Sequence, residues 1–487
     1  MRPLPRILAA TSLATAIVLT ANGCSSDRKT PETNVVLIVI DTLRADRLSC
    51  QGWDRETSPA IDALAASGAR MAEHHAQCSW TQPSVVSMMS GQYITKYCDT
   101  YRDGAPVLAR TLQEAGYHTV GVVSNTLVSS EAGFDAGFDH FDARRLTQEE
   151  RATRAAEGGS PGPCRDAPEM FDELIEQVDL HLASDDVAPM FLYWHLMEPH
   201  APYLGHPDLA QEFSRRDDLP TAWHQSTYDA AAKVPDDEQA ASWELINSGR
   251  ARYEREIRKA DDAVARLLAA LDERGMRENT IFVIASDHGE SLWDHPKMQL
   301  PIESAEDPPH EFFHQEHAML LNQGLIRTPL IIAGPGIPEN TVVTGNTENV
   351  DIFPTLLELL DLPGPRGLDG ESLVPAWRGE PLEDGNAYAY VLHNLMIREA
   401  DTNLKFILPT KAGQTVAGRP HLYDVGQDKA EQVDLNATQK EDRNRLLGKL
   451  QAWREAHPME SRFRVRGSNE QQDFEDMGYA GGDEDEE

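Results

Sequence analysis

Five short apolar runs are spaced along the chain, and each has the length and composition of a buried strand. Four of the five contain several β-branched residues, and four of the five end in a polar side chain. Continuous apolar runs of this kind are typical of strands in a parallel sheet that is covered on both faces. We therefore predict strands over Asn34–Asp41, His118–Ser124, Met190–His195, Thr280–Ser286 and Pro329–Ala333.

Two segments have the residue spacing of amphipathic helices. Ala60–Ser67 has helical spacing and stops at Gly68, and a longer segment, Tyr253–Arg274, has apolar residues every three or four positions and is closed by Gly275. Strands and helices thus alternate over roughly residues 34–380. This alternation predicts the α/β fold class, with a large, mainly parallel sheet and helices on both faces.

The remaining segments have weaker patterns. Ala143–Pro168 and Gly205–Gly249 are largely polar and contain scattered Pro and Gly, so we interpret both as irregular insertions. Short strands are predicted at Ala387–Leu392 and Leu404–Leu408, and a last helix at Glu441–Ala456. These three elements predict a small C-terminal α+β subdomain.

These patterns divide the chain into five parts. They are a signal peptide (1–23), a polar tether (24–33), a main α/β domain (34–384), the C-terminal subdomain (385–466) and an acidic tail (467–487).

The N-terminus has the pattern of a secretion signal. Met1–Arg6 carries two Arg, an uncharged run follows over Ile7–Ala21, and Gly23 precedes Cys24. A run of 15 residues is too short for a membrane span. The segment resembles a bacterial lipoprotein signal, which predicts lipidation of Cys24 and a protein anchored to a membrane of the cell envelope; an ordinary cleaved signal is the alternative.

The charge balance restricts the partners. The chain has 44 Lys+Arg and 80 Asp+Glu, a formal net charge of −36. A surface this acidic repels the phosphate backbone of nucleic acids, which argues against a nucleic-acid partner. A small anionic substrate would need a local positive centre, and a bound cation is the simplest source of one.

Four cysteines remain once Cys24 is set aside. Cys50, Cys78, Cys98 and Cys164 show no CxxC spacing, which argues against a cysteine zinc site. In an oxidising compartment they allow three pairings, and the spacing does not choose between them.

Polar residues at the ends of two predicted strands are candidates for metal ligands. Asp41 ends the first strand, and Asp287 with His288 follows the strand at Thr280–Ser286. Sites in open α/β sheets gather at the carboxyl ends of the strands. Two carboxylates and an imidazole form an oxygen and nitrogen ligand set suited to a divalent cation. Taken singly, an Asp after a strand is also a common helix cap.

Eight short motifs follow one another between about residue 34 and residue 480. The motifs are Asp41–Asp46 with Ser58–Ala65, Ser79–Gly91, Glu198–Tyr203, Ser286–Glu290, His317–Leu321 with Arg327–Leu330, Asp351–Thr355, Leu422–Asp424 and Met477–Tyr479. In this order they resemble the landmarks of the sulfatase family, which belongs to the alkaline phosphatase superfamily.

The resemblance implies both a fold and a metal site. The fold is a three-layer α/β/α sandwich with a C-terminal four-stranded antiparallel sheet. The site holds one divalent metal ion, with Asp41, Asp287 and His288 as ligands. The nucleophile of the family stands two residues before the Pro of its motif, and here that position is Thr81, before Pro83. Thr81 is thereby implied to be the nucleophile and a fourth metal contact.

Threonine at this position changes the expected chemistry. Sulfatases convert a Cys or Ser to formylglycine, and Thr81 is not a substrate for that conversion; Val85 also replaces the Arg of the motif. A Thr hydroxyl activated by a metal can attack an ester directly. Superfamily members with a Thr nucleophile act on phosphate esters and phosphodiesters or transfer phosphoryl-linked groups. Alternatively, Thr81 is the N-cap of a helix beginning at Pro83-Ser84, a role compatible with catalysis.

Two histidines receive roles from the resemblance. His200, in Glu-Pro-His-Ala-Pro, would contact the ester oxygens; alternatively it only orders a Pro-rich loop. His317 would protonate or stabilise the leaving oxygen, a task suited to an imidazole near neutral pH. His295, His310 and His314 lie in the same stretch and are the other candidates for this role.

Two further residues are candidates for substrate binding. Asn125 follows the strand at His118–Ser124, where relatives place a polar substrate contact. Arg44 would supply the positive charge that Val85 does not; a solvated surface charge is the alternative.

We therefore expect a metal-dependent hydrolase of sulfate or phosphate esters, with a small anionic ester or a sulfated or phosphorylated glycan or lipid as substrate. The alternatives are a phosphodiesterase or phosphoryl-group transferase of the cell envelope, and an inactive sulfated-glycan binding protein. Among Ca, Mn, Zn and Mg, the expected ligand set suits Mn, Zn or Mg better than an all-oxygen calcium site.

Overall fold

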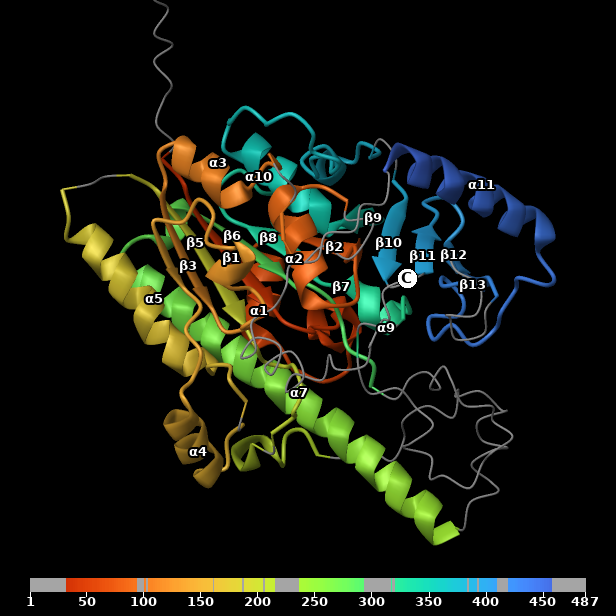
Figure 1. Ribbon diagram of the computed structural model, residues 1–487, viewed down its shortest axis with the longest axis horizontal. Coiled ribbons are helices and arrows are strands. Elements are labelled where there is room, and N and C mark those ends of the chain that lie inside the picture. Colours follow the sequence, from red (N-terminus) through yellow and green to blue (C-terminus); the bar gives the residue numbers. More distant parts are fainter. Residues whose placement is uncertain are drawn as a thin grey trace, which may run out of the picture. The chain divides into compact units, whose positions relative to one another are not determined.

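A large sheet with β1 (Asn34–Ile40) near its middle forms the centre of the fold (Figure 1). The computed structural model describes residues 32–93, 100–101, 104–160, 162–185, 188–204, 206–214, 236–292, 317, 320–382, 385–391, 394–409 and 419–457. These residues belong to one compact unit that begins at Pro31.

Nine strands of the described chain pair in this sheet, in the order β4-β3-β5-β1-β6-β8-β2-β7, with β9 paired to β2. Their bounds, after β1, are β2 Gly68–His75, β3 His118–Val123, β4 His140–Asp142, β5 Met190–Leu196, β6 Thr280–Ala285, β7 Arg327–Thr328, β8 Leu330–Ala333 and β9 Thr341–Glu348. The pairs among β1, β3, β4, β5 and β6 are parallel, as is β2 with β9, whereas β8 runs antiparallel to β6 and β2, and β7 antiparallel to β2. The predicted, mainly parallel sheet is therefore confirmed.

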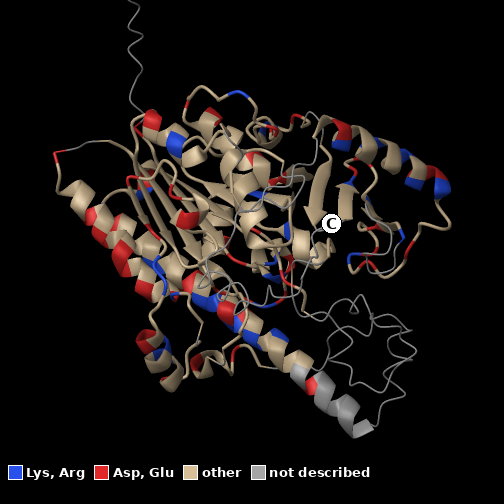
Figure 2. Cartoon of the chain, in the orientation of Figure 1, with Lys and Arg blue, Asp and Glu red and all other residues tan. Residues whose placement is uncertain are grey.

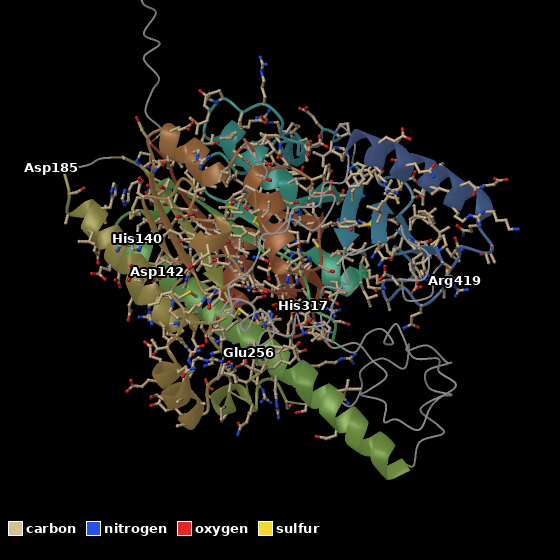
Figure 3. The ribbon with its side chains drawn as sticks, in the orientation of Figure 1. His140, Asp142, Asp185, Glu256, His317 and Arg419 are labelled. Carbon is tan, nitrogen blue, oxygen red and sulfur yellow. The ribbon has the colours of Figure 1, made fainter. Side chains whose placement is uncertain are left out.

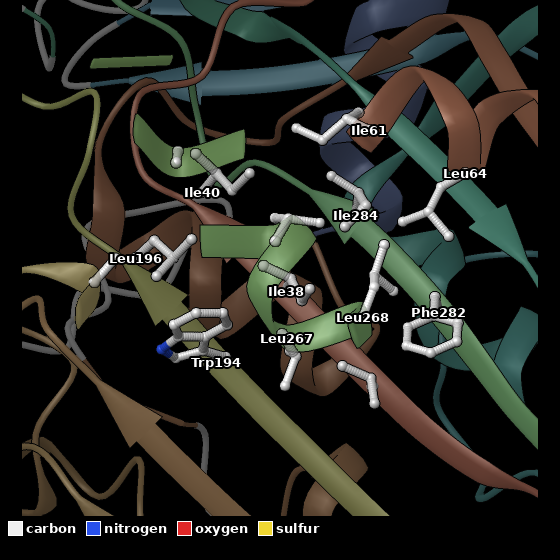
Figure 4. Close-up of a cluster of buried hydrophobic side chains, with 14 of the residues drawn as sticks. Ile38, Ile40, Ile61, Leu64, Trp194, Leu196, Leu267, Leu268, Phe282 and Ile284 are labelled. Atoms are coloured by element: carbon white, nitrogen blue, oxygen red, sulfur yellow. The ribbon is translucent and has the colours of Figure 1, made fainter. Parts of the chain in front are cut away.

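Helices cover both faces of the sheet. The α-helices described between Pro59 and Leu359, of which α4 contributes no residue to either core, are α1 Pro59–Ala66, α2 Thr81–Ser90, α3 Leu108–Glu114, α4 Gln148–Ala156, α5 Ala167–Leu182, α7 Asp236–Glu273, α9 Gln323–Ile326 and α10 Ile352–Leu359. Even-numbered residues of β1 pack in one core with α1, α5 and α7, and odd-numbered residues pack in a second core with α2, α3 and α10. Figure 4 shows the first core, in which Ile38 and Trp194 of the sheet lie beside Leu267 of α7. This is the expected three-layer α/β/α sandwich.

The two stretches expected to be irregular contain helices. In the first, Thr147 caps α4: its hydroxyl accepts from the backbone N–H of Glu150 at 3.3 Å, and the Glu150 carboxylate accepts from the N–H of Thr147 at 2.7 Å. In the second, α7 begins at Asp236 and not near Tyr253. The part of α7 before Tyr253 contains several Ala, Glu and Arg residues, which favour helix although they form no strong apolar stripe. The prediction of irregular structure in these two stretches was wrong where α4 and the first part of α7 form.

The C-terminal strands form a separate antiparallel sheet, in the order β10-β11-β12-β13. Their bounds are β10 Ala387–Val391, β11 Asn394–Arg398, β12 Leu404–Pro409 and β13 His421–Asp424, and helix α11 spans Lys440–Ala456. Leu446, Leu450 and Trp453 of α11 are buried in one core with side chains of this sheet. The predicted antiparallel sheet and last helix are confirmed.

Charged side chains lie mainly on the outer helices, while the strands of the main sheet are largely uncharged (Figure 2). Among the described residues, no helix has the length and apolar character needed to cross a bilayer. Cys50, Cys78 and Cys164 have free thiols, and Cys98 lies outside the described residues.

Candidate active site

Asp41, Asp287 and His288 come together at the carboxyl ends of two neighbouring strands. Strands β1 and β6 pair in parallel, with Val39 opposite Ala285, so the residues that follow them emerge side by side. All three side chains are fully buried. One ligand atom from each lies within 4.8 Å of the others. The three residues expected to bind a metal are therefore adjacent.

Hydrogen bonds orient the imidazole of His288 toward the two carboxylates. Its Nδ1 lies 2.8 Å from the carbonyl oxygen of Gly289, which can only accept, so the proton resides on Nδ1. The Nε2 atom lies 3.4 Å from Asp287 Oδ2 and 3.7 Å from Asp41 Oδ1. This nitrogen is thereby left with a lone pair facing the carboxylates, as a metal ligand requires.

Two carboxylate oxygens of the cluster lack a protein donor. Within the described part of the chain, Asp41 Oδ1 and Asp287 Oδ2 are buried and accept no hydrogen bond. Burial and the nearby Asp41 charge raise the pKa of Asp287 to about 7. Burial alone would raise the pKa of Asp41 as well, but the nearby imidazoles of His195, His200 and His288 outweigh burial and lower it. Two close, buried carboxyls with free oxygens and a neutral imidazole fit a divalent cation.

Thr81 lies at this cluster, at the first position of α2. Its Oγ1 is 3.3 Å from His288 Nε2 and 3.2 Å from Asn125 Nδ2. The helix begins at Thr81 itself, and its N-cap is Trp80, so the interpretation of Thr81 as an N-cap was wrong. The hydroxyl is instead directed to the cluster of Asp41, Asp287 and His288, next to the backbone N–H groups of a helix N-terminus, where an anion is favoured.

The start of α2 is fastened to the end of β6. The Ser84 hydroxyl donates to the carbonyl oxygen of Asp287, and the Asn349 amide donates to the carbonyl oxygen of Ser286 at 3.1 Å. His74, on β2, contacts the Asn349 side chain in turn at 2.8 Å. These contacts fix the position of Thr81 relative to Asp287.

Asn125 joins a carboxylate ligand to the proposed nucleophile. Its Nδ2 donates to Asp41 Oδ2 at 2.7 Å and to Thr81 Oγ1 at 3.2 Å, while its Oδ1 accepts from the N–H of Leu127 at 2.9 Å. The structure thus places Asn125 in the site, bonded to two of the residues expected there. A direct contact of Asn125 with substrate stays a prediction.

Three histidine rings form a chain at one side of the cluster. The His317 ring centroid lies 4.7 Å from that of His288 and 4.9 Å from that of His200. His317 Nδ1 lies 3.2 Å from Glu290 Oε1 (Figure 3 marks His317). Burial and the nearby His200 lower the pKa of His317 to about 3, so its imidazole is neutral at pH 7 without a metal. His317 itself therefore does not titrate near neutral pH in this state, contrary to what its expected role suggests.

Arg44 is buried at the edge of the site and is not a solvated surface charge. Its guanidinium forms an ion pair with Asp46 at 2.8 Å and donates to the carbonyl oxygen of Glu290 at 3.0 Å. Much of its charge is therefore neutralised by Asp46. A role of Arg44 in substrate binding stays a prediction.

Sequence reasoning missed two groups that touch the site. His195, on β5, lies with Nε2 3.5 Å from Asp41 Oδ2 and Nδ1 2.8 Å from the Tyr193 hydroxyl. Glu290 faces His317, as described above, and burial raises its pKa to about 7. For His195, the only signal in the sequence was a polar residue within the apolar run at Met190–His195. For Glu290, the signal was its place directly after Asp287-His288-Gly289.

Several expected features lie outside the described residues. They are Cys24 with the signal and tether, the alternative histidines His295, His310 and His314, the motif Met477–Tyr479, and the acidic tail.

The α/β/α sandwich and its buried Asp-Asp-His cluster, with a hydroxyl at a helix N-terminus, define a class of enzymes that act on anionic esters at a metal centre. Residues 33–362, more than half of the chain, match the family model for Sulfatase. The chain belongs to this family, within the alkaline phosphatase superfamily, and is a hydrolase of sulfuric or phosphoric esters.

Individual relatives are distant. The chain is 25% identical to the multifunctional alkaline phosphatase superfamily protein PehA of Trinickia caryophylli, over 70% of this chain and 76% of the relative. It is 23% identical to an arylsulfatase of Clostridium perfringens, over 86% of this chain and 93% of the relative. Among solved structures, the phosphonate monoester hydrolase of Agrobacterium radiobacter superposes with a TM-score of 0.67 at 21% identity, covering 87% of this chain and 96% of that one.

Proposed function

We propose that the protein is a metal-dependent hydrolase of small phosphate or sulfate esters in which the Thr81 hydroxyl attacks the ester in line. The observation that supports this most is the position of Thr81 Oγ1, 3.3 Å from His288 Nε2 at the ligand cluster. A divalent cation held by Asp41, Asp287, His288 and Thr81 would neutralise the anionic group of the substrate and favour ionisation of the hydroxyl.

The residues around Thr81 have separate tasks in this mechanism. Asn125 donates to Thr81 Oγ1 and so holds it in one rotamer, while the first N–H groups of α2 face the ester oxygens. His200 binds the ester oxygens, and His317, supported by Glu290, stabilises the leaving oxygen. Attack by Thr81 forms a bond from its oxygen to phosphorus or sulfur and breaks the bond to the leaving oxygen. Water then releases the Thr81 ester.

Substitutions at Thr81 test this proposal. Thr81→Ala should lose at least roughly a hundredfold in kcat, since both the attacking atom and a metal contact disappear, whereas Thr81→Ser should retain part of the activity. Thr81→Cys should be poorly active and gain no sulfatase activity, because a thiolate prefers softer ions and Val85 replaces the Arg of the family motif. Thr111→Ala, on α3 and away from the site, is the matched control.

Hydrolysis should be measured on four substrates: an aryl sulfate, a phosphate monoester, a phosphodiester and a phosphonate. Each substrate is tested with Mn, Zn, Mg and Ca in turn. Phosphate ester turnover should exceed aryl sulfate turnover, and mass analysis should find Thr81 unmodified. If Thr81→Ala hydrolyses the esters like the parent protein, the nucleophile is another residue. If every metal-supplemented protein is inactive on all four esters, the proposed function is wrong.

The location of the protein belongs to the same proposal. The arrangement of Met1–Arg6, Ile7–Ala21 and Gly23-Cys24 supports export and lipidation of Cys24, with the enzyme held at the cell envelope. One acyl chain binds membranes only marginally, with K of about 10⁴ M⁻¹, so stable anchoring requires the several chains of a mature lipoprotein. Cys24→Ala should move the protein out of the membrane fraction, and unchanged partitioning would show that Cys24 carries no lipid.

A further inference from the structure

The turn that follows β1 contains a residue in a conformation that threonine rarely adopts. Asp41 and Thr42 are its two central residues, and the N–H of Leu43 closes it by donating to the carbonyl oxygen of Ile40 at 3.4 Å. The backbone φ angle of Thr42 is 55°, in the left-handed region. The branched Cβ of threonine makes this region costly, and glycine or asparagine is usual at such a position. A strained residue thus lies directly beside the proposed metal ligand Asp41.

The side chain of Thr42 does not stabilise this conformation. Thr42 is fully buried, and among the described residues its hydroxyl has no hydrogen-bond partner. Asparagine and aspartate tolerate the left-handed region because their side chains can bond to the nearby backbone, and Thr42 makes no such bond to a described residue. Contacts from neighbouring residues must therefore hold Thr42 in place.

Tyr253, on α7, holds the turn from one side. Its hydroxyl donates to the carbonyl oxygen of Thr42 at 2.6 Å and accepts from the N–H of Arg44 at 3.0 Å. Tyr253 is itself fully buried, and its ring lies 5.5 Å from that of Tyr203 in an edge-to-face arrangement. Helix α7 packs with β1 and β5 in one core (Figure 4). The hydroxyl is thus anchored in the helix layer that covers the sheet.

The end of β6 holds the turn from the other side. The N–H of Thr42 donates to Asp287 Oδ1 at 3.3 Å, and the N–H of Leu43 donates to the Ser286 hydroxyl at 3.0 Å. The same Ser286 hydroxyl donates to the carbonyl oxygen of His288 at 2.6 Å. Because the N–H of His288 also donates to Asp287 Oδ1, at 2.9 Å, the other oxygen, Oδ2, is the one left for an ion. The turn after β1 therefore helps to orient ligands that follow β6.

We propose that Tyr253 is a positioning residue of the metal site: it keeps Thr42 strained and so preserves the arrangement of carboxylates that binds the ion. The inference rests on the proposed function, since it concerns the same metal site. With its N–H held by Asp287 and its carbonyl oxygen held by Tyr253, Thr42 cannot rotate about its N–Cα bond. Without the Tyr253 hydroxyl, Thr42 can relax toward negative φ, and its N–H then moves relative to Asp287. Strained residues persist only where the surrounding structure fixes them in this way.

A double-mutant cycle between Tyr253 and Thr42 tests this proposal. Tyr253→Phe removes only the hydroxyl, whereas Thr42→Gly removes the strain, because glycine adopts positive φ freely. Thr42→Asn replaces Thr42→Gly if the latter does not fold, since asparagine also tolerates this region. The measurement is a calorimetric titration of Mn²⁺ or Zn²⁺ into the metal-free, full-length proteins.

Tyr117→Phe is the matched control. Tyr117 is also buried, and its hydroxyl also donates to a backbone carbonyl oxygen, that of Thr33, at 2.9 Å. These two residues directly precede β3 and β1, at the ends of the strands opposite to the site. Loss of a buried tyrosine hydroxyl as such is therefore separated from loss of the contact with Thr42.

Tyr253→Phe should bind metal roughly tenfold more weakly than the parent, and Tyr117→Phe should bind it equally. In the Thr42→Gly background, the same Tyr253→Phe change should weaken binding by less than about threefold, because no strain is left to relax. Equal affinity of Tyr253→Phe and the parent overturns the proposal. A tenfold loss in both backgrounds also overturns it, since Tyr253 would then act by packing and not through Thr42.

Hydrogen exchange followed by mass spectrometry separates this inference from the proposed function. In the metal-free protein, the peptide that spans Asp41–Arg47 should exchange roughly tenfold faster in Tyr253→Phe than in the parent, and the acceleration should be smaller in the Thr42→Gly background. If the parent binds neither metal, the proposed function fails, while this exchange still decides whether Tyr253 restrains Thr42. If the exchange of this peptide is unchanged in Tyr253→Phe, Tyr253 does not restrain the turn and the inference is wrong.

Discussion

At the scale of single residues, Asp41 is held so that only one of its oxygens is left for an ion. Its Oδ2 accepts from Asn125 and faces His195, while Oδ1 is directed toward His288. The Tyr193 hydroxyl lies 2.8 Å from His195 Nδ1. If it donates there, the proton of His195 is on Nε2, facing Asp41. Such outer contacts fix the orientation of a ligand and its affinity for a metal.

His195→Phe should therefore weaken metal binding by roughly 10- to 100-fold, and Tyr193→Phe should weaken it less. His195→Gln should recover part of the affinity, because its amide can still donate to Asp41. The measurement is a calorimetric titration of Mn²⁺ or Zn²⁺ into the metal-free protein, with His118→Gln on β3 as the control. If His195→Phe binds the metal as tightly as the parent does, His195 contributes to packing only and not to metal binding.

Glu198 carries a second prediction at this scale. Burial and the nearby Asp166 raise its pKa from 4.5 to about 7. Between these pH values the unfolded chain loses this proton before the folded protein does, so the side chain makes folding less favourable as the pH rises. The free energy of unfolding of the parent, relative to Glu198→Gln, should fall between pH 4.5 and 7.5, by ~3 kcal/mol at most. Urea unfolding at both pH values measures this, and a difference that stays constant or rises contradicts it.

At the scale of elements, the turn after β6 depends on the absence of a side chain at Gly289. A Cβ there would lie 2.0 Å from the carbonyl oxygen of Gly324, and the N–H of Gly289 donates to the carbonyl oxygen of Leu325 at 2.6 Å. The turn that presents Asp287 and His288 is thus packed against the start of α9. Any displacement of this turn therefore moves both Asp287 and His288, two of the three proposed metal ligands.

Gly289→Ala should for this reason lower both the metal affinity and the unfolding temperature. Gly448→Ala, in the exposed part of α11 where a Cβ meets nothing within 4 Å, should instead stabilise the protein by about 0.5–1 kcal/mol. Differential scanning calorimetry with and without metal compares the two variants. If Gly289→Ala binds metal as tightly as the parent does, the turn can accommodate a side chain without loss of metal affinity.

Elements with an unbroken apolar run were predictable from the sequence, and those stabilised by their neighbours were not. Strands β1, β3, β5 and β6 were found because both of their faces are buried. Strand β2 (Gly68–His75) contains Arg70, Glu73 and two histidines, and nothing in its pattern indicates a strand. It is a strand because it pairs with β7, β8 and β9. Helix α7 was shortened in the prediction because its first part lacks a strong apolar stripe.

The same distinction applies to the site. Asp41, Asp287 and His288 directly follow apolar strands, so the parallel sheet dictates that they meet. Thr81, His200 and His317 were placed by the resemblance to the sulfatase family, because their segments have no strand pattern of their own. His195 was missed because the sequence of a buried strand does not reveal which neighbour a polar side chain faces.

At the scale of the whole molecule, the second sheet is packed against the segment that follows the helix of Thr81, the proposed nucleophile. The Trp453 ring of α11 stacks on Tyr388 at 4.8 Å and meets the edge of Tyr93 at 5.1 Å. Tyr93 follows α2 closely, and its hydroxyl contacts Glu348 at the end of β9. Contacts of this kind couple the stability of the antiparallel sheet to that of the helix bearing Thr81.

Trp453→Ala should therefore destabilise the protein by about 3–5 kcal/mol, and the remaining structure should still unfold in one transition. Arg454→Ala, on the exposed side of the same helix, should have little effect. Circular dichroism and loss of metal binding, followed along one denaturant series, should have the same midpoint. Two separated transitions would contradict the coupling.

The positions of the site residues along the chain also constrain when the enzyme can become active during its synthesis. Asp41, Thr81 and Asn125 leave the ribosome well before Asp287 and His288, and Asn349, which fastens the turn after β6, follows later still. A growing chain therefore contains the Asp41 carboxylate and the Thr81 hydroxyl long before it contains Asp287 and His288. If the proposed site holds a metal ion, the ion must be acquired late in the synthesis of this protein, and chains that end before His288 should be unable to retain it.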